Sequence, residues 1–327
     1  MIFSYYMGMI ILKRCLIFGG SGFLGKNLCR HLLQKKDCYE LQVYGRHTKQ
    51  FDEFSNIFPN IKTITGEVST EKDFYSLLKG IDIVFYLISA TNASNKDMVL
   101  EFEQNVLPVI RLLEACKKYS VRFVFFSSGG TVYGLPKYVP IDEMHSTDPI
   151  SPYGIHKLTL EKCIEYYGRT YGLDYLILRI TNPYGMYQNP KKNQGAIAVF
   201  LAKAILGNTI EIWGDGNAVR DYIFVSDVMD ACDALMHYQG KKIFNISSGR
   251  GYSLNEIVTE IYRQLRNRPI RVRYLPMRIQ DVSVSILDNT LIGQETSWKP
   301  KINLQEGIRQ MIKMWNPVTN KFDYGGS

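Results

Sequence analysis

A tyrosine and a lysine four residues apart, Tyr153 and Lys157, form the clearest reactive pair in the sequence. On a helix, this spacing places both side chains on one face. Because a nearby ammonium favours the ionised phenol, we expect the pKa of Tyr153 to fall below its ordinary value of about 10. Such a tyrosine accepts the proton of an alcohol while a hydride leaves the same carbon. The pair therefore predicts oxidation and reduction at a carbinol carbon.

A glycine-rich segment near the N-terminus has the spacing of a phosphate-binding loop. Gly19, Gly22 and Gly25 follow a short apolar run and precede a helical pattern that ends near Leu33. In a strand–loop–helix unit that binds a dinucleotide, the first glycine permits a tight turn and the second lets the backbone approach the pyrophosphate. The third lets the helix pack closely on the strand, and the N-terminus of the helix faces the phosphates.

Strand-like apolar runs alternate with helical patterns along the first half of the chain. The strand-like runs cover residues 41–44, 61–64, 81–87, 123–127 and 175–180, and the helical patterns cover 71–78, 101–118 and 153–171. This alternation predicts an α/β fold with a Rossmann-type, doubly wound parallel sheet. The glycine loop then lies at the carboxyl ends of the strands, where such folds bind their ligands.

The composition excludes several other classes of protein. The net charge is +8, but the basic residues are scattered, so we expect no nucleic-acid partner. Six widely spaced cysteines without a Cys-x-x-Cys pair indicate reduced thiols in a cytoplasmic protein and no metal site. The apolar N-terminus is too short to span a bilayer, so we expect no membrane insertion and interpret residues 1–8 as an extension.

With both motifs in place, the chain resembles the extended short-chain dehydrogenase/reductases, and specifically their nucleotide-sugar 4-epimerase branch. The resemblance runs from about residue 9 to residue 315. Besides the glycine loop and the catalytic Tyr153–Lys157 pair, residues 127–134 match a Ser-rich TVYG segment of the family. Asn105 matches an asparagine on the following helix, and Asn182 matches an asparagine that contacts the substrate. The resemblance implies a UDP-sugar substrate.

The resemblance also implies the cofactor site, although the residues leave the form of the dinucleotide open. NAD-binding relatives end the second strand with an aspartate for the ribose 2′-hydroxyl. Here Gly45 and Arg46 stand at that place, and an arginine there accommodates the 2′-phosphate of NADP. The epimerase resemblance implies tightly held NAD, which we place ahead of NADP. The implied cofactor-binding residues are Gly19, Gly22, Phe23, Leu24, Gly25, Arg46, Glu67, Val68, Leu87, Ser89, Asn105, Tyr153 and Lys157.

The C-terminal half contains the residues that the resemblance assigns to the nucleotide sugar. Arg220 is expected to bind phosphate, as the fork of a guanidinium does, and Trp213 to pack near the base. Arg278 matches a second phosphate-binding arginine, although the two residues after it depart from the family pattern. Seven residues further on, Ser285 falls at the position that gates the space beside the sugar C2. Its small side chain leaves room for a 2-acetamido group.

The segment Ser128-Gly129-Gly130-Thr131 discriminates among the reactions of the family. Many relatives carry a catalytic serine or threonine at the position of Gly129, so the hydroxyl that polarises the sugar oxygen would come from Ser128 or Thr131, or be absent. The Asp-Glu pair of 4,6-dehydratases and the glutamate of related decarboxylases are both missing here, which disfavours these two reactions. Epimerisation at C4 and reduction of a 4-keto sugar remain.

We interpret the chain as an NAD-dependent nucleotide-sugar 4-epimerase that acts through a 4-keto intermediate. Interconversion of UDP-N-acetylglucosamine and UDP-N-acetylgalactosamine is favoured, with UDP-glucose and UDP-galactose as the other pair. An NADP-dependent reductase of nucleotide 4-keto sugars is the alternative, which Arg46 and Gly129 favour slightly. A non-catalytic sensor that binds the cofactor is an alternative of another class.

The same resemblance predicts how the chain is divided and assembled. Residues 9–182 and 221–249 are expected to form the dinucleotide-binding domain, and residues 183–220 and 250–315 a nucleotide-sugar-binding lobe. Relatives imply a homodimer formed by the helices at 101–118 and 153–171. The apolar residues that fit such an interface, and equally fit a core, are Leu112, Leu113, Leu160 and Ile164.

Overall fold

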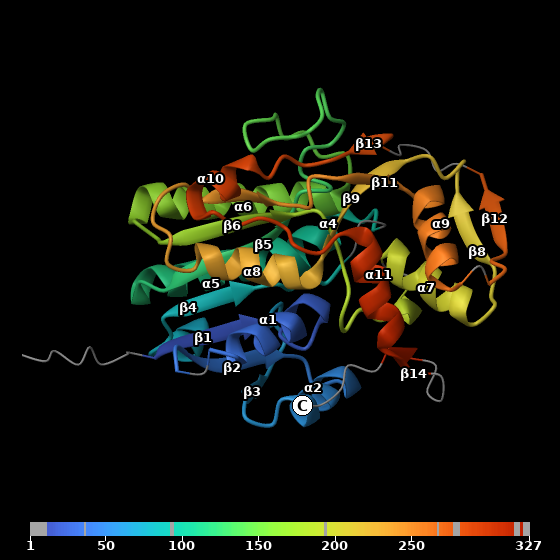
Figure 1. Ribbon diagram of the computed structural model, residues 1–327. Coiled ribbons are helices and arrows are strands. Elements are labelled where there is room, and N and C mark those ends of the chain that lie inside the picture. Colours follow the sequence, from blue (N-terminus) through green and yellow to red (C-terminus); the bar gives the residue numbers. More distant parts are fainter. Residues whose placement is uncertain are drawn as a thin grey trace, which may run out of the picture.

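Seven parallel strands form the central sheet of the protein (Figure 1). From one edge to the other they are β10 (Ile243–Ile246), β6 (Tyr175–Ile180), β5 (Arg122–Ser128), β4 (Ile83–Tyr86), β1 (Lys13–Phe18), β2 (Tyr39–Gly45) and β3 (Lys62–Thr65). Successive residues of a strand face opposite sides of the sheet, so Leu16 belongs to one hydrophobic core and Ile17 to the other. The predicted Rossmann-type α/β fold is confirmed.

The structure is a computed structural model that describes residues 12–35, 37–91, 95–192, 195–266, 268–276, 282–316 and 321–322. The predicted N-terminal extension and the predicted substrate residue Arg278 lie outside the described residues. Among the helices that are described, none has the length and apolar character needed to cross a membrane.

Helices cover both faces of the central sheet (Figure 1). One face packs against α1 (Phe23–Leu33), α2 (Lys49–Ile57), α8 (Val225–Leu235) and α10 (Thr290–Thr296). The other face packs against α3 (Phe74–Leu78), α5 (Leu107–Tyr119) and α6 (Pro152–Tyr171). Helix α4 (Met98–Glu101) continues through a π-helical turn at Phe102–Val106 into α5.

The sequence predicted most of these elements close to their observed bounds and missed α2, α8, α10 and β10. Helix α3 begins later than the helical pattern at residue 71 because Asp73 caps it, with its carboxylate accepting the Ser76 N–H at 3.0 Å. The four apolar residues proposed for a dimer interface are 0–1% exposed inside this chain's own core, so they are not available to a partner: Leu112, Leu113, Leu160 and Ile164.

Smaller sheets lie beside the carboxyl ends of the central strands (Figure 1). Strand β9 (Val219–Phe224) pairs with β7 (Asn182–Tyr184), β11 (Gly251–Ser253) and β13 (Val284–Ser285), and β8 (Ile210–Trp213) pairs with β12 (Val272–Leu275). A third hydrophobic core joins strands of these sheets to α7 (Ala196–Ile205), α9 (Leu254–Gln264) and α11 (Leu304–Lys313). The short strands β14 (Trp315–Asn316) and β15 (Lys321–Phe322) pair with each other. The exact division into two domains stays a prediction.

Helix α6 is defined by local signals at both ends. At its start, the Ser151 hydroxyl accepts the N–H of Gly154 at 3.1 Å, and Pro152 stands at the first helical position. At its end, Gly172 adopts a φ of +70°, a left-handed conformation that favours glycine. These signals place Tyr153 and Lys157 in the first turns of the helix.

A buried ion pair joins α6 to the middle of the sheet. The carboxylate of Glu161 on α6 accepts hydrogen bonds from Nε and Nη2 of Arg179 on β6. The shorter of the two, from Nη2, is 2.6 Å long. The hydroxyl of Ser127 on β5 also donates to Glu161, at 2.5 Å, and Arg179 Nη1 donates to the Tyr133 hydroxyl at 3.0 Å. Because all partners are buried, the network fixes α6 against two strands at once.

Removing one partner of this ion pair should be costly. We predict that Arg179→Met lowers the free energy of unfolding by about 3–5 kcal/mol, because it leaves the Glu161 carboxylate buried without its cation. Urea denaturation measures the change. The control Lys162→Met removes an exposed pair with Glu165 and should cost less than about 1 kcal/mol. Equal losses in the two variants would show that the buried pair has no special role.

Candidate active site

Tyr153 and Lys157 lie together beside the carboxyl end of β5. The ammonium of Lys157 is buried and donates to the Phe126 carbonyl at 3.0 Å. The same nitrogen lies 4.8 Å from the centroid of the Phe125 ring and 5.8 Å from that of Tyr153. The two predicted catalytic side chains are therefore neighbours, with the ammonium directed at the backbone of β5.

The prediction of a lowered pKa for Tyr153 was wrong for this structure. Desolvation raises the pKa of Tyr153 to about 12, a hydrogen bond with Ser128 acts to lower it, and the charge of Glu101 raises it further. Burial lowers the pKa of Lys157 to about 8, against the opposite effects of Glu161 and Glu101. Since the ammonium contacts a carbonyl rather than the phenol oxygen, desolvation prevails. A further positive charge beside the phenol would favour its ionised form.

The two hydroxyls offered by the sequence differ in their surroundings. Ser128, the last residue of β5, makes a side-chain hydrogen bond with Tyr153. The Oγ1 of Thr131 is buried and has no hydrogen-bond partner within the described part of the chain. The geometry therefore favours Ser128 as the hydroxyl that acts beside Tyr153.

Packing explains why position 129 carries no hydroxyl. A Cβ at Gly129 would lie 2.3 Å from Cδ1 of Leu287 and 2.9 Å from the carbonyl oxygen of Arg179. Leu287 is fully buried in a small core with Val132 and Ile141, so it has little freedom to move away. The place that the family fills with a serine or threonine is therefore filled from a distant segment of this chain.

The glycine loop has the geometry of a dinucleotide site. Gly19 has a φ of +86°, which favours glycine. A Cβ at Gly25 would lie 2.3 Å from the Gly19 carbonyl oxygen. The glycine at this position therefore allows α1 to pack closely against the loop that follows β1. Gly22 caps α1 without a side chain, leaving the N–H groups of the first turn to a ligand. These residues fit the pyrophosphate of a dinucleotide.

Arg46 and Glu67 come together at the carboxyl ends of β2 and β3. The Nε of Arg46 lies 3.4 Å from Oε2 of Glu67, and both side chains are partly or largely exposed. A carboxylate at this place accepts hydrogen bonds from the ribose hydroxyl groups and repels a 2′-phosphate. It also pairs with Arg46, the residue that would otherwise bind the 2′-phosphate of NADP. The pair therefore favours NAD.

The segment after β4 connects the glycine loop to the start of α5. The Leu87 N–H donates to the last carbonyl of β1 at 3.0 Å. A Cβ at Gly19 would lie 3.1 Å from Cγ1 of Ile88, so the two segments are in close contact. Asn105, in the π-helical turn, accepts the Ala90 N–H at 2.8 Å. Asn105 therefore orients the segment predicted to line the nicotinamide side.

Three predicted substrate residues lie on neighbouring strands of the small sheet around β9. Arg220 of β9 and Ser285 of β13 are Cα partners, and Ser285 is buried. Asn182 of β7 donates to the Asp221 carbonyl of β9 at 2.8 Å. Trp213 belongs to the separate β8–β12 pair, where it is 46% exposed. The structure thus groups Arg220, Asn182 and Ser285.

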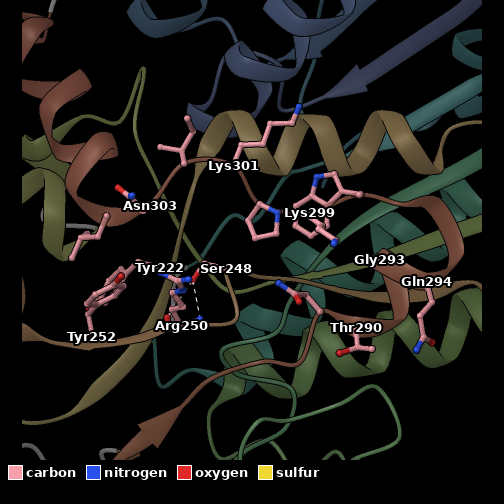
Figure 2. A pocket seen from close by; sticks show the side chains of 15 residues that line it. Tyr222, Ser248, Arg250, Tyr252, Thr290, Gly293, Gln294, Lys299, Lys301 and Asn303 are labelled. Atoms are coloured by element: carbon pink, nitrogen blue, oxygen red, sulfur yellow. Dashed lines mark hydrogen bonds between the residues drawn. The ribbon is translucent and has the colours of Figure 1, made fainter.

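A cavity of about 700 Å³ lies between β9, β11, α10 and the start of α11 (Figure 2). Figure 2 shows Tyr222, Ser248 and Arg250 together on one wall, with Lys301 and Asn303 on the opposite side. The cavity is separate from the catalytic pair, because none of the predicted site residues that the structure describes is among those that line it.

Sequence reasoning missed two residues that lie beside Tyr153. His156 is fully buried, and its ring packs edge-on against that of Tyr153 with centroids 5.1 Å apart. Glu101 is also fully buried and contacts His156. A histidine inside the Tyr-x-x-x-Lys segment was the available signal, but the glutamate comes from a helix 55 residues earlier.

The fold, the glycine loop and the Tyr153–Lys157 pair together define an enzyme that exchanges hydride with a bound dinucleotide. Comparison with known proteins gives the same class and a narrower group. The NAD dependent epimerase/dehydratase family matches residues 15–247, and the chain belongs to this family.

Two curated relatives and two solved structures show how far the similarity extends. A putative UDP-glucose 4-epimerase of Methanocaldococcus jannaschii is 33% identical, covering 94% of this chain and 99% of its own. The UDP-glucose 4-epimerase of Mycolicibacterium smegmatis is 31% identical over 92% of this chain and 98% of its own. The structure of Thermotoga maritima UDP-glucose 4-epimerase with UDP-glucose has a TM-score of 0.86 and 32% identity, covering 92% of this chain and 97% of that one. UDP-N-acetylglucosamine 4-epimerase of Methanobrevibacter ruminantium has a TM-score of 0.83 and 26% identity, covering 92% and 99%.

A hydroxyl cannot simply be restored at position 129. We predict that Gly129→Ser lowers both the melting temperature and the turnover, because its Cβ meets Leu287 and the backbone of β6. Thermal unfolding and initial rates measure both effects. The matched control is Gly130→Ser, since a Cβ at Gly130 has no atom within 4 Å. If Gly129→Ser were as stable as Gly130→Ser, the packing explanation would be wrong.

Proposed function

We propose that the protein interconverts the C4 epimers of a UDP-sugar, with UDP-N-acetylglucosamine and UDP-N-acetylgalactosamine as its preferred pair. The observation that carries this proposal is the grouping of Ser128, Tyr153 and the buried Lys157 ammonium beside β5, on the same sheet edge as the glycine loop. The absence of carboxyl groups at Gly130 and Thr131 supports chemistry confined to C4.

In the proposed reaction, Tyr153 takes the proton of the C4 hydroxyl and later returns it to the same oxygen. Bound NAD would accept the C4 hydride and give it back to the opposite face of the 4-keto sugar, and its oxidised ring would add positive charge near the phenol. Ser128 holds the phenol oxygen by a hydrogen bond, and Lys157 supplies a fixed positive charge in the same buried region. The residues that would hold the cofactor are those of the glycine loop, Glu67 and Asn105.

The 4-keto sugar must rotate in the site so that its opposite face meets the cofactor. This rotation requires a substrate that is held by its nucleotide rather than by its hexose. Arg220 on β9 is proposed to bind the diphosphate, because a guanidinium engages phosphate oxygens in pairs. With binding energy placed on the nucleotide, the hexose can present either face without breaking strong contacts. Asn182, on the adjacent strand β7, is proposed to contact the sugar side.

The preference for a 2-acetamido sugar is supported by Ser285. This small residue is buried directly beside Arg220 in the β13–β9 ladder, so a larger side chain there would fill space next to the proposed diphosphate site. One matched structure is a UDP-N-acetylglucosamine 4-epimerase in complex with UDP-N-acetylmuramic acid, and another holds UDP-glucose. Both pairs of sugars therefore belong in the test.

We also propose a homodimer formed by the helices α4, α5 and α6. The buried residues Leu112, Leu113, Leu160 and Ile164 cannot contribute to such an interface. Other apolar side chains on these helices are exposed. Val99 is 66% exposed, Leu107 47% and Tyr166 48%. Burying such a surface against a second copy would remove it from water.

The direct test is anaerobic incubation of the purified protein with UDP-N-acetylglucosamine and no added cofactor, followed by chromatography of the nucleotide sugars. We expect UDP-N-acetylgalactosamine to accumulate to an equilibrium mixture. Unchanged substrate, together with NADP released from the denatured protein, would contradict the proposal and indicate a reductase of keto sugars.

Tyr153→Phe should separate catalysis from binding. We expect it to reduce turnover by at least about a thousandfold, because the phenol proton acceptor is lost while the ring remains. Retention of NAD, measured by fluorescence of the released or reduced cofactor, should be unchanged. Thr131→Val is the matched control, and turnover close to that of the unmodified protein is expected. A large loss in Thr131→Val with little in Ser128→Ala would reverse the assignment of the hydroxyl.

Ser285→Tyr tests the sugar preference. The larger side chain should reduce kcat/KM for UDP-N-acetylglucosamine by about tenfold or more relative to that for UDP-glucose, because one bulky contact in a pocket is worth about 1–3 kcal/mol. Parallel kinetics with both sugars give the ratio. An unchanged ratio would mean that Ser285 does not face the sugar C2 substituent.

A further inference from the structure

Two buried ionisable side chains that the proposed reaction does not use lie beside Tyr153. Glu101, the last residue of α4, and His156, in the second turn of α6, are each 0% exposed. Nδ1 of His156 lies 2.5 Å from Oε2 of Glu101. A carboxylate removed from water in this way requires several partners to remain charged.

Glu101 has such partners from three segments of the chain. Its Oε2 accepts the Thr91 hydroxyl at 2.6 Å and the Asn105 amide at 2.9 Å. Its Oε1 accepts the Asn95 amide at 2.8 Å. These contacts, together with His156, connect the segment after β4, the π-helical turn and the catalytic helix α6. The two carboxylate oxygens are therefore held by hydrogen bonds from the protein itself.

His156 is the link between this carboxylate and the phenol. Burial, and then the adjacent Lys157 ammonium, hold the pKa of His156 well below its ordinary value, so the imidazole is neutral. Neither ring nitrogen makes a hydrogen bond within the described residues, although Nδ1 lies close to the Glu101 carboxylate, so a proton on Nε2 would be buried without an acceptor. The carboxylate favours the tautomer with its proton on Nδ1. The ring then stands between Glu101 and Tyr153.

We propose that Glu101 and His156 are positioning residues that fix the Tyr153 ring to the segment after β4 and place one negative charge behind the Tyr153–Lys157 pair. The inference rests on the proposed function, because it assigns the pair a role in the proton transfer at Tyr153. The phenol thereby keeps its proton until the cofactor brings positive charge into the site. Proton transfer at Tyr153 then takes place only when the cofactor is bound.

The groups that act on the ionisation of Tyr153 and Lys157 do so in defined directions. Ser128 from β5 stabilises the ionised phenol, and Glu101 from α4 opposes it. For the ammonium of Lys157, Glu161 from α6 and Glu101 both favour the charged form. Removing the charge of Glu101 should therefore make Tyr153 ionise at lower pH.

The test is Glu101→Gln, which keeps the size and most hydrogen bonds of the side chain. We expect the acid limb of the kcat–pH profile to move to lower pH by about 0.5–1 unit, because a like charge near the phenol has been removed. The phenolate absorbance of Tyr153 in the cofactor-free protein, taken as the difference from a Tyr153→Phe background, should move in the same direction. A titration and a profile that stay unchanged, or a kcat that falls equally at every pH, would overturn the proposal.

Two further variants complete the test. Glu103→Gln neutralises an exposed glutamate two residues further on, and both the titration and the profile should stay as in the unmodified protein. His156→Gln leaves the charge of Glu101 in place, so we expect kcat to fall by about tenfold with KM within about twofold, as misplacement of a catalytic group does. A kcat unchanged in His156→Gln would contradict the positioning role even if Glu101→Gln did not fold.

The two proposals fail in different ways. If no UDP-sugar is converted by the unmodified protein, the proposed function is wrong. The absorbance titration needs no substrate, so a shift of the Tyr153 ionisation in Glu101→Gln would still support the effect of the buried charge, and its absence would reject that effect.

Discussion

The buried contact between helix α6 and the two strands β5 and β6 is the constraint on which the site depends. Glu161, Arg179 and Ser127 exchange short hydrogen bonds in a region closed to water, and one turn earlier Lys157 donates to the Phe126 carbonyl. Buried charges tolerate little displacement, because an unpaired ion in this environment is strongly destabilising. The helix is therefore held in one position, and Tyr153 at its start is held with it.

This constraint also decides which atoms surround the phenol. Since β6 and the segment at Leu287 close over Gly129, a side-chain hydroxyl has no room there, and Ser128 on the adjacent position makes the hydrogen bond with Tyr153. The same rigidity leaves the phenol desolvated and raises its pKa. In this structure the phenol therefore holds its proton more strongly than a free tyrosine does, which is a property of the packing and not of any single residue.

The cofactor side of the site follows simpler rules. The glycine loop, the capping of α1 and the ends of β2 and β3 are all local consequences of a parallel sheet whose strands end at one edge. Glu67 beside Arg46 adds the feature that favours NAD, and it arises from two strands that are neighbours in the sheet. The proposed substrate side lies on β9, whose partner strands come from three separate parts of the chain.

The sequence by itself determined the α/β class, six strands of the central sheet, the helices α1, α3, α5 and α6, the glycine loop and the Tyr153–Lys157 pair, because each depends on local spacing that periodicity and turn chemistry reveal. Only the tertiary structure decided the rest. The raised pKa of Tyr153, the exclusion of a hydroxyl at Gly129, the burial of Leu112 and the contact of Glu101 with His156 each depend on groups distant in the chain. Desolvation and packing density are set by these distant neighbours, which sequence patterns do not specify.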